Sequence, residues 1–236
     1  MLMPEIISKY DIDKDWKNRW RAANKFTNSN WVQRMPIEDQ EMVTKLKGLD
    51  EEQAKIIITP YLEDKYQLNK EKMDDVVEKM TEYLNEQKAE LFEAMEKLTR
   101  HSIDYKLFTI YLTTLNRCPY SWQEWAIWMV DTSNPKFRKR NRTGIFAHEL
   151  LHMQTHKYYE NVEPMSKLSR KQFNDLKESL TFLLNHEFKG IDMREDTWYE
   201  DHQKLRKALE EYRLKSDKNF DDLIAFGCDY MIKNNL

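Results

Sequence analysis

The chain has 236 residues, of which 40% are hydrophobic and 33% are charged. This length and composition suit a globular protein with one large domain or two small ones. Lys and Arg number 38 and Asp and Glu 41, which gives a formal net charge of -3. A general nucleic-acid-binding protein normally carries a basic excess, so this balance excludes nucleic acid as an expected partner.

Neither a membrane nor a disulfide framework is expected. No apolar stretch approaches the roughly 20 residues that a membrane span needs. The two cysteines, Cys118 and Cys228, lie far apart and in no metal-ligand spacing, which fits a reducing compartment. The first ten residues hold no sustained apolar run of the kind that a secretory signal contains. We therefore expect a cytoplasmic protein.

Helices are predicted for the first hundred residues. Only four glycines and six prolines occur in the chain, and this scarcity favours a mostly helical fold. Asp50 forms a capping-box pattern with Gln53, and the short helix that follows is expected to end or kink at Pro60. Asn69 has the position of an N-cap for a long helix that reaches about Thr99, with apolar residues at steps of three and four.

Two segments after residue 101 have the composition of β-strands. Residues 107–115 and 125–130 are rich in β-branched and aromatic side chains, and the turn-like residues 116–121 separate them. We expect these two strands to be neighbours in a small sheet.

Helices are predicted to resume after the two strands. The first begins at about Thr143, and the second begins at Ser169, which forms a capping box with Gln172. Two more are expected near Glu200 and over residues 217–233.

The predicted fold class is therefore α+β and mostly helical, with a small β-sheet packed on the helix that begins near Thr143. A soft boundary separates a helical N-terminal region, residues 1–100, from an α+β part, residues 101–236. No segment at this boundary has the composition of a flexible linker, so the two parts are also compatible with one compact unit.

A metal-binding pattern lies on the first of the later helices. Residues 148–152 read His-Glu-Leu-Leu-His within an apolar stretch. Residues four apart share one face of an α-helix, so His148 and His152 are within reach of one metal ion. Glu149 is turned about 100° from His148, where it would contact a water on the metal. Two imidazoles that hold Zn²⁺, with a carboxylate that takes a proton from the zinc-bound water, are the components of metal-assisted hydrolysis.

With this motif after two predicted strands, the chain resembles the zincin metallopeptidases, and most closely the gluzincin type. The resemblance covers roughly residues 107–188, and residues 1–100 do not share it. It implies a small sheet, then the metal-binding helix, then a second helix whose glutamate completes the zinc site. It also implies hydrolysis of a peptide bond in a peptide or protein substrate.

Glu178 is the predicted third zinc ligand. It lies midway along a predicted helix among apolar neighbours, where a buried carboxylate without a partner would be costly. Two alternatives remain. His156 continues the four-residue series, but each step rotates the side chain by about 40°, and the glycine turn of the metzincin type is missing. His186 and Glu187 lie at the end of the same predicted helix as Glu178.

The resemblance implies a group that supports a zinc-bound histidine. Gluzincins of the thermolysin kind have an aspartate four residues after the ligand glutamate, but Phe182 stands at that position here. Asn185, Asp175 or an acid of the last helix would have to supply this support.

A peptidase also needs a group that stabilises the oxyanion. Tyr199 and His202, just before a predicted helix, are the predicted residues, and Tyr158 and Tyr159, just past the metal-binding helix, are alternatives. The strand over residues 126–130 is a candidate edge for pairing with an extended peptide.

Two other functions remain open. One is a non-catalytic, zinc-stabilised helical module that binds a partner protein, which the replacement of the expected aspartate by Phe182 favours. A structural zinc site would have four protein ligands, whereas a catalytic site would have an open position. The other is a carboxylate-bridged di-iron protein, but such sites use two Glu-x-x-His pairs, and Glu149 with His152 forms only one.

Overall fold

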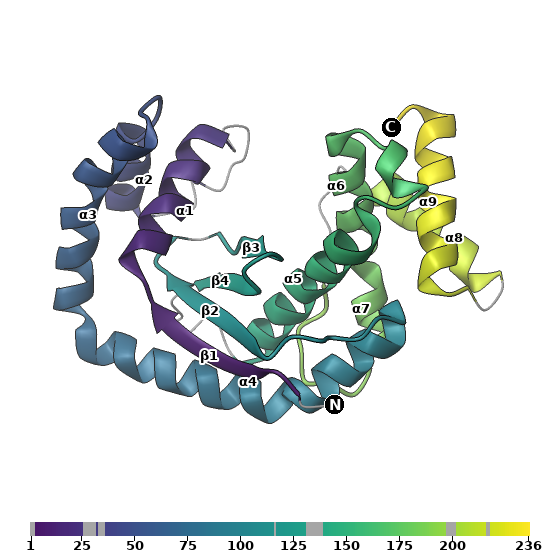
Figure 1. Cartoon of the computed structure of the whole chain (residues 1–236), viewed down its shortest axis with the longest axis horizontal. Helices are drawn as coiled ribbons and strands as arrows, with labels where there is room; N and C mark the ends of the chain where they lie inside the picture. The colour runs from purple at the N-terminus through teal and green to yellow at the C-terminus, as the bar shows by residue number, and fades with distance from the viewer. Residues whose placement is uncertain are drawn as a thin grey trace. The chain divides into compact units, whose positions relative to one another are not determined.

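The computed structural model describes residues 3–25, 32, 36–115, 117–130, 139–196, 202–215 and 218–236. The fold is α+β and mostly helical, as the sequence predicts (Figure 1). The elements in chain order are β1 (Glu5–Tyr10), α1 (Ile12–Lys25), α2 (Ile37–Lys45), α3 (Glu51–Leu68), α4 (Lys70–Thr99), β2 (Leu107–Thr113), β3 (Tyr120–Ser121), β4 (Ala126–Val130), α5 (Lys139–Tyr159), the 3-10 helix η2 (Met165–Lys167), α6 (Arg170–Ser179), α7 (Phe182–Glu187), α8 (Gln203–Leu214) and α9 (Phe220–Asn234). None of the helices in the described ranges is both long enough and apolar enough to span a membrane.

The chain divides into two compact units. Unit 1 consists of Met1–Pro4, Glu86–Tyr105 and Lys139–Leu236, and unit 2 consists of Glu5–Asn85 and Lys106–Arg138. Each unit therefore takes residues from both sides of residue 100. The predicted boundary at that residue stays a prediction.

Unit 2 contains a four-stranded sheet with the order β1-β2-β4-β3. The two predicted strands, β2 and β4, are neighbours and run parallel. β1 was not expected, because its residues lie within the first hundred, which we predicted to be helical. Its six residues alternate between the two faces, and Ile6 and Ser8 are buried. The alternation is too short to stand out in the sequence.

β4, the strand predicted to be an edge that pairs with a peptide, already has a neighbour on each side over part of its length. β3 pairs antiparallel with the start of β4, with Tyr120 opposite Ile127 and Ser121 opposite Ala126. Over these residues β4 is therefore an inner strand, and the prediction of an edge there was wrong.

Two side chains of α4, those of Thr81 and Asn85, close the outer edge of β1. The Asn85 amide accepts a hydrogen bond from the Ile6 N–H (3.3 Å) and donates one to the Ile6 carbonyl (2.7 Å). The Thr81 hydroxyl accepts from the Ser8 N–H (2.9 Å). Because these groups satisfy the exposed backbone of β1, they prevent another strand from pairing there.

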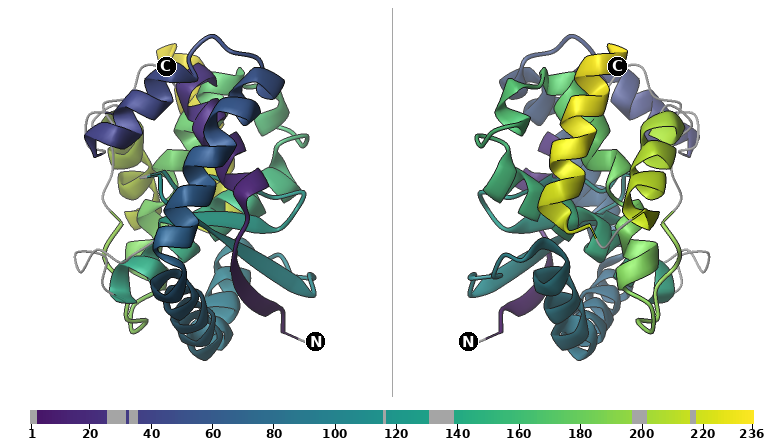
Figure 2. Two further views of the ribbon diagram at one scale, coloured as in Figure 1. Left: turned by 90° about the vertical axis from the view of Figure 1, so that its left-hand side faces the viewer. Right: turned by 90° about the vertical axis from the view of Figure 1, so that its right-hand side faces the viewer.

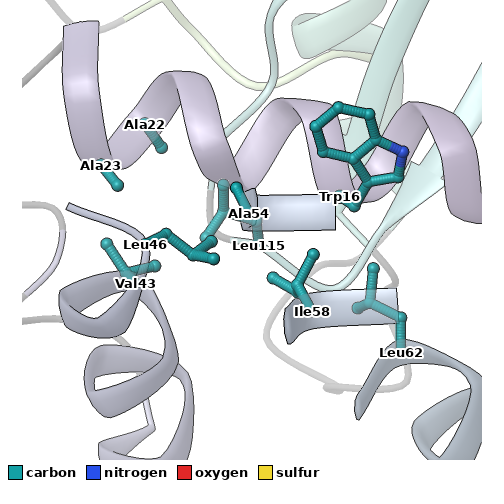
Figure 3. Packing of buried hydrophobic residues seen from close by; sticks show 9 residues of the cluster. All are labelled: Trp16, Ala22, Ala23, Val43, Leu46, Ala54, Ile58, Leu62 and Leu115. Carbon is teal, nitrogen blue, oxygen red and sulfur yellow. The ribbon is translucent and has the colours of Figure 1, made fainter. Parts of the chain in front are cut away.

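The apolar core of unit 2 lies between α1, α2 and α3 (Figure 3). Its buried residues are Trp16, Ala22, Ala23, Val43, Leu46, Ala54, Ile58, Leu62 and Leu115. The sequence predicted that this helix ends or kinks at Pro60; α3 continues past it to Leu68, so the prediction of an end there was wrong. Proline removes the hydrogen bond to the carbonyl four residues earlier. Here that residue is Ile56, which is 70% exposed, so water can satisfy the carbonyl.

In unit 1, α6 packs against α9, and α8 and α9 run side by side (Figure 2). A Cβ at Gly227 of α9 would lie 2.4 Å from Leu176 Cδ1 of α6, so the absence of a side chain allows this close approach. The predicted capping box of Ser169 and Gln172 opens α6. The single helix expected through residue 187 is instead two, because α6 ends at Ser179 and α7 begins at Phe182.

Candidate metal centre

α5 presents His148 and His152 on one face, as their spacing predicts. The other side of the same two turns is apolar and fully buried, with Phe146, Leu150 and Leu151 in the core of unit 1. This packing fixes the rotation of the helix about its axis. The two imidazole rings then lie with their centroids 4.3 Å apart and their planes at 76°.

Glu178, in the last turn of α6, faces both histidines. Its Oε1 lies 3.2 Å from His152 Nε2, and its Oε2 lies 3.5 Å from His148 Nε2. One ligand atom from each of these three residues lies within 4.8 Å of the other two. The structure therefore brings together the three residues that the sequence nominated as ligands.

These positions fit a zinc ion. Zn–N and Zn–O bonds of about 2.0–2.2 Å in a tetrahedron place neighbouring ligand atoms roughly 3.3–3.5 Å apart. Each carboxylate oxygen of Glu178 lies near this spacing from one imidazole, with Oε1 3.2 Å from His152 Nε2 and Oε2 3.5 Å from His148 Nε2. The His148 and Glu178 side chains are 22% and 24% exposed, so both are partly accessible to solvent, whereas His152 is buried.

Asp196 supports His148, and sequence reasoning missed it. Its Oδ1 lies 2.8 Å from His148 Nδ1, which leaves Nε2 as the nitrogen that faces Glu178. A carboxylate on the far nitrogen of a ligand histidine fixes the tautomer and the ring orientation at metal sites. The Thr181 hydroxyl in turn donates to Asp196 Oδ2 (2.6 Å).

Two further features hold Asp196 in place. The Asn185 amide accepts from the Asp196 N–H (2.7 Å) and donates to the Asp196 carbonyl (3.1 Å). Asn185, one of the three predicted sources of support, thus acts on Asp196 rather than on a ligand. Gly144 lets the same segment approach α5 closely, because a Cβ there would lie 3.2 Å from the Arg194 carbonyl oxygen.

The pKa values of the two histidines are shifted in opposite directions. Burial alone would lower the pKa of His148, but hydrogen bonds to Asp196 and Glu178 raise it to about 10. Burial lowers the pKa of His152 to about 3, and the positive charges of Lys177 and His148 act in the same direction. Without a metal, these contacts favour protonation of His148 over protonation of His152.

The two carboxylates are held in the ionised state that metal binding requires. Burial alone would raise the pKa of Glu178, but His152, His148 and Lys177 together lower it. Burial likewise opposes ionisation of Asp196, and the hydrogen bond to His148 overcomes it and lowers the pKa of Asp196.

Lys177 is a second residue that sequence reasoning missed. Its Nζ lies 3.4 Å from Glu178 Oε1, and its side chain is only 7% exposed. Burial lowers the pKa of this ammonium group, whereas the charges of Glu178 and Glu149 oppose the shift. Glu149, the predicted general base, is half-buried, and its charge acts on His148 as well as on Lys177.

The alternative ligands have other contacts. His156 Nδ1 lies 3.1 Å from Glu160 Oε2, and the imidazole packs on the Phe173 ring. His186 is exposed on α7, and Glu187 forms an ion pair with Arg213. Among the residues that the structure describes, the metal-ligand group consists of His148, His152 and Glu178.

The groups predicted to stabilise an oxyanion are only partly described. Tyr199 lies outside the described residues. His202 Nε2 lies 3.4 Å from Asp175 Oδ1 on α6, and its role stays a prediction. The Tyr158 hydroxyl donates to the Ser102 carbonyl (2.9 Å), and the Tyr159 hydroxyl donates to Asp221 (2.5 Å).

No protein-family model, curated protein sequence or solved structure matches this chain. The function of the chain is therefore inferred from the residues of unit 1 themselves.

Proposed function

We propose that this chain is a zinc-dependent peptidase in which His148, His152 and Glu178 bind the metal. The observation that carries the proposal is the convergence of these three side chains within 4.8 Å of one another. The contact of Asp196 with Nδ1 of His148 supports it, because the second ring nitrogen of a metal-bound histidine usually donates a hydrogen bond to a carboxylate or a carbonyl.

Each residue has a distinct role in the proposed reaction. Zinc, when bound, lowers the pKa of a coordinated water to about 7 and polarises the carbonyl under attack. Glu149, which follows His148 directly on α5, accepts the proton of the attacking water and passes it to the leaving amine. Asp196 holds the His148 ring in the orientation in which Nε2 faces Glu178. His202 and Tyr199 are the proposed partners of the developing oxyanion.

Hydrolysis is favoured over a purely structural zinc site. A structural site is closed by four protein ligands, whereas a catalytic site has three and an open position. Within the described ranges the group has three members, and two of them are partly exposed. Asp196 also supplies the contact with a histidine that was expected from an aspartate at the position of Phe182, and the lack of that contact was the feature that favoured a non-catalytic module.

The choice of a peptide bond as the substrate rests on the sequence. The HELLH pattern at residues 148–152 resembles that of the zincin metallopeptidases, which act on peptides and proteins. The proposed substrate is therefore a peptide or protein chain.

The test is a comparison of the wild-type chain with Glu149→Gln. The wild type is expected to contain about one zinc per chain and to cleave a mixture of quenched fluorogenic peptides. Glu149→Gln should keep the metal but lose turnover, because an amide cannot accept the proton. Glu163→Gln, at a side chain that is 70% exposed, serves as the control and should retain full activity. Full activity with bound zinc in Glu149→Gln would refute the proposed role.

A further inference from the structure

Lys177 places a positive charge beside the metal ligands. Its ammonium nitrogen lies 3.4 Å from Glu178 Oε1, and the same oxygen lies 3.2 Å from His152 Nε2. The ligand carboxylate therefore contacts an imidazole and an ammonium group at once. A metal ion bound to Glu178 would lie within a few ångströms of this cation.

The burial of Lys177 is unusual for a lysine on this helix. Lys171 of α6 is 80% exposed and forms an i,i+4 ion pair with Asp175, as surface lysines commonly do. A long lysine side chain normally extends until its charged end reaches water. The Lys177 side chain is instead 7% exposed and turned toward Glu178. Because a buried charge needs a partner, its position depends on the carboxylates around it.

The charges around the cluster indicate what Lys177 does. Three carboxylates act on it or on the histidines, namely those of Glu149, Glu178 and Asp196. Arg206, 4% exposed, lies 3.4 Å from Asp196 and partly balances the negative charge of that carboxylate. Lys177 is the corresponding cation on the side of Glu178.

We propose that Lys177 is an internal counter-ion of the metal centre, which keeps Glu178 in place when no metal is bound and weakens the affinity for a divalent cation. This inference rests on the proposed zinc site. An ammonium group that neutralises a ligand carboxylate stabilises the metal-free fold, but it repels an incoming cation. Lys177 is thus a positioning residue, and its removal should change stability and metal affinity in opposite directions.

Lys177→Met tests this proposal with two measurements that do not involve turnover. The first is the dissociation constant for Zn²⁺, determined by competition with a chromophoric chelator, and the second is the melting temperature of the metal-free chain. Lys177→Met should bind Zn²⁺ at least tenfold more tightly than the wild type and melt at a lower temperature without metal. Lys177→Arg keeps the charge and should bind Zn²⁺ within about threefold of the wild type. Lys171→Met, on the exposed side of the same helix, should change neither quantity.

The outcomes separate this inference from the proposed function. A wild-type chain that binds no Zn²⁺ overturns both. A wild-type chain that binds Zn²⁺, with unchanged or weaker binding by Lys177→Met, overturns only the role of Lys177. If Lys177→Met is unfolded without metal, Zn²⁺ must restore its helical circular dichroism. Failure of Zn²⁺ to do so would also refute the proposal.

Discussion

Each unit of this chain has a buried polar cluster, but only one of them fits a metal ion. In unit 2, Arg19 is fully buried, contacts Asp39 at 2.8 Å and lies 3.9 Å from Asp15. Lys65 and the Tyr61 hydroxyl also bind Asp39, at 2.8 and 2.9 Å. Cations and hydroxyl donors of the protein thus satisfy these carboxylates.

In unit 1, the converging atoms are mostly electron-pair donors of the kind that bind metals. His148 and His152 direct Nε2 toward Glu178, and Asp196 occupies the far nitrogen of His148. Burial of charge is therefore not by itself a sign of a functional site. A cluster closed by cations of the protein stabilises the fold, whereas converging imidazole and carboxylate atoms are the donors that a metal ion would use.

The largest effect is expected from Arg19→Met in the cluster of unit 2. The change leaves the Asp15 and Asp39 carboxylates buried without their main cation, which should destabilise the fold by about 3–5 kcal/mol. Urea denaturation measures this loss. Lys55→Met removes an exposed ion pair with Asp13 and should change the free energy of unfolding by less than about 1 kcal/mol. Similar losses in the two variants would contradict a structural role for the Arg19 cluster.

A smaller effect is expected when Asp196 is changed in unit 1. Asp196→Asn weakens the orientation of His148 but keeps the shape of the side chain, so the affinity for Zn²⁺ should fall by about 10–100-fold. Chelator competition measures the change. Asp192→Asn, in the same segment, should leave the affinity within about twofold of the wild type. An unchanged affinity in Asp196→Asn would show that the contact with His148 does not tune the site.

The metal-free chain should become less stable as the pH rises. Because the pKa of His148 in the folded chain, about 10, exceeds its ordinary value of 6.5, the proton binds the folded state more tightly. This stabilisation is complete below about pH 6.5 and disappears as the pH rises toward 10. The melting temperature in the presence of a chelator should therefore fall by a few degrees over this range.

The control for this pH dependence is His148→Gln, whose side chain at this position does not titrate. The part of the fall in melting temperature that His148 causes should be missing in this variant. An identical decline in His148→Gln and in the wild type would assign the pH dependence to other groups.

The smallest effect is expected at an exposed ion pair. Lys79 and Asp75, both more than half exposed on α4, form an i,i+4 contact. Lys79→Ala should change the free energy of unfolding by less than about 0.5 kcal/mol. A change above 1 kcal/mol in urea denaturation would contradict the view that buried charges, and not solvent-exposed ones, stabilise this fold.

Local patterns in the sequence predicted which three side chains converge in unit 1. The four-residue spacing placed His148 and His152 on one face, because helix geometry depends only on the period. Glu178 followed from the apolar character of its neighbours together with the family resemblance. These residues converge because the apolar side chains of α5 and α6 are buried and so fix the rotation of each helix about its axis.

The residues around the ligands could not be predicted in the same way. Asp196 lies in an irregular segment, where no periodicity relates its position to that of a helix. Lys177 has the sequence context of a solvated lysine, and only packing turns it inward. β1 was missed because a six-residue strand is stabilised by pairing with β2, whose partner residues are about a hundred positions away.

The zinc content of the purified chain, compared with that of Glu178→Ala, decides whether the three converging side chains bind a metal. About one zinc per chain is expected for the wild type after dialysis, and a large loss of zinc is expected from Glu178→Ala, with the far-UV circular dichroism spectrum preserved. A wild-type chain without zinc, or a Glu178→Ala variant that retains the wild-type content, would contradict the proposed zinc site.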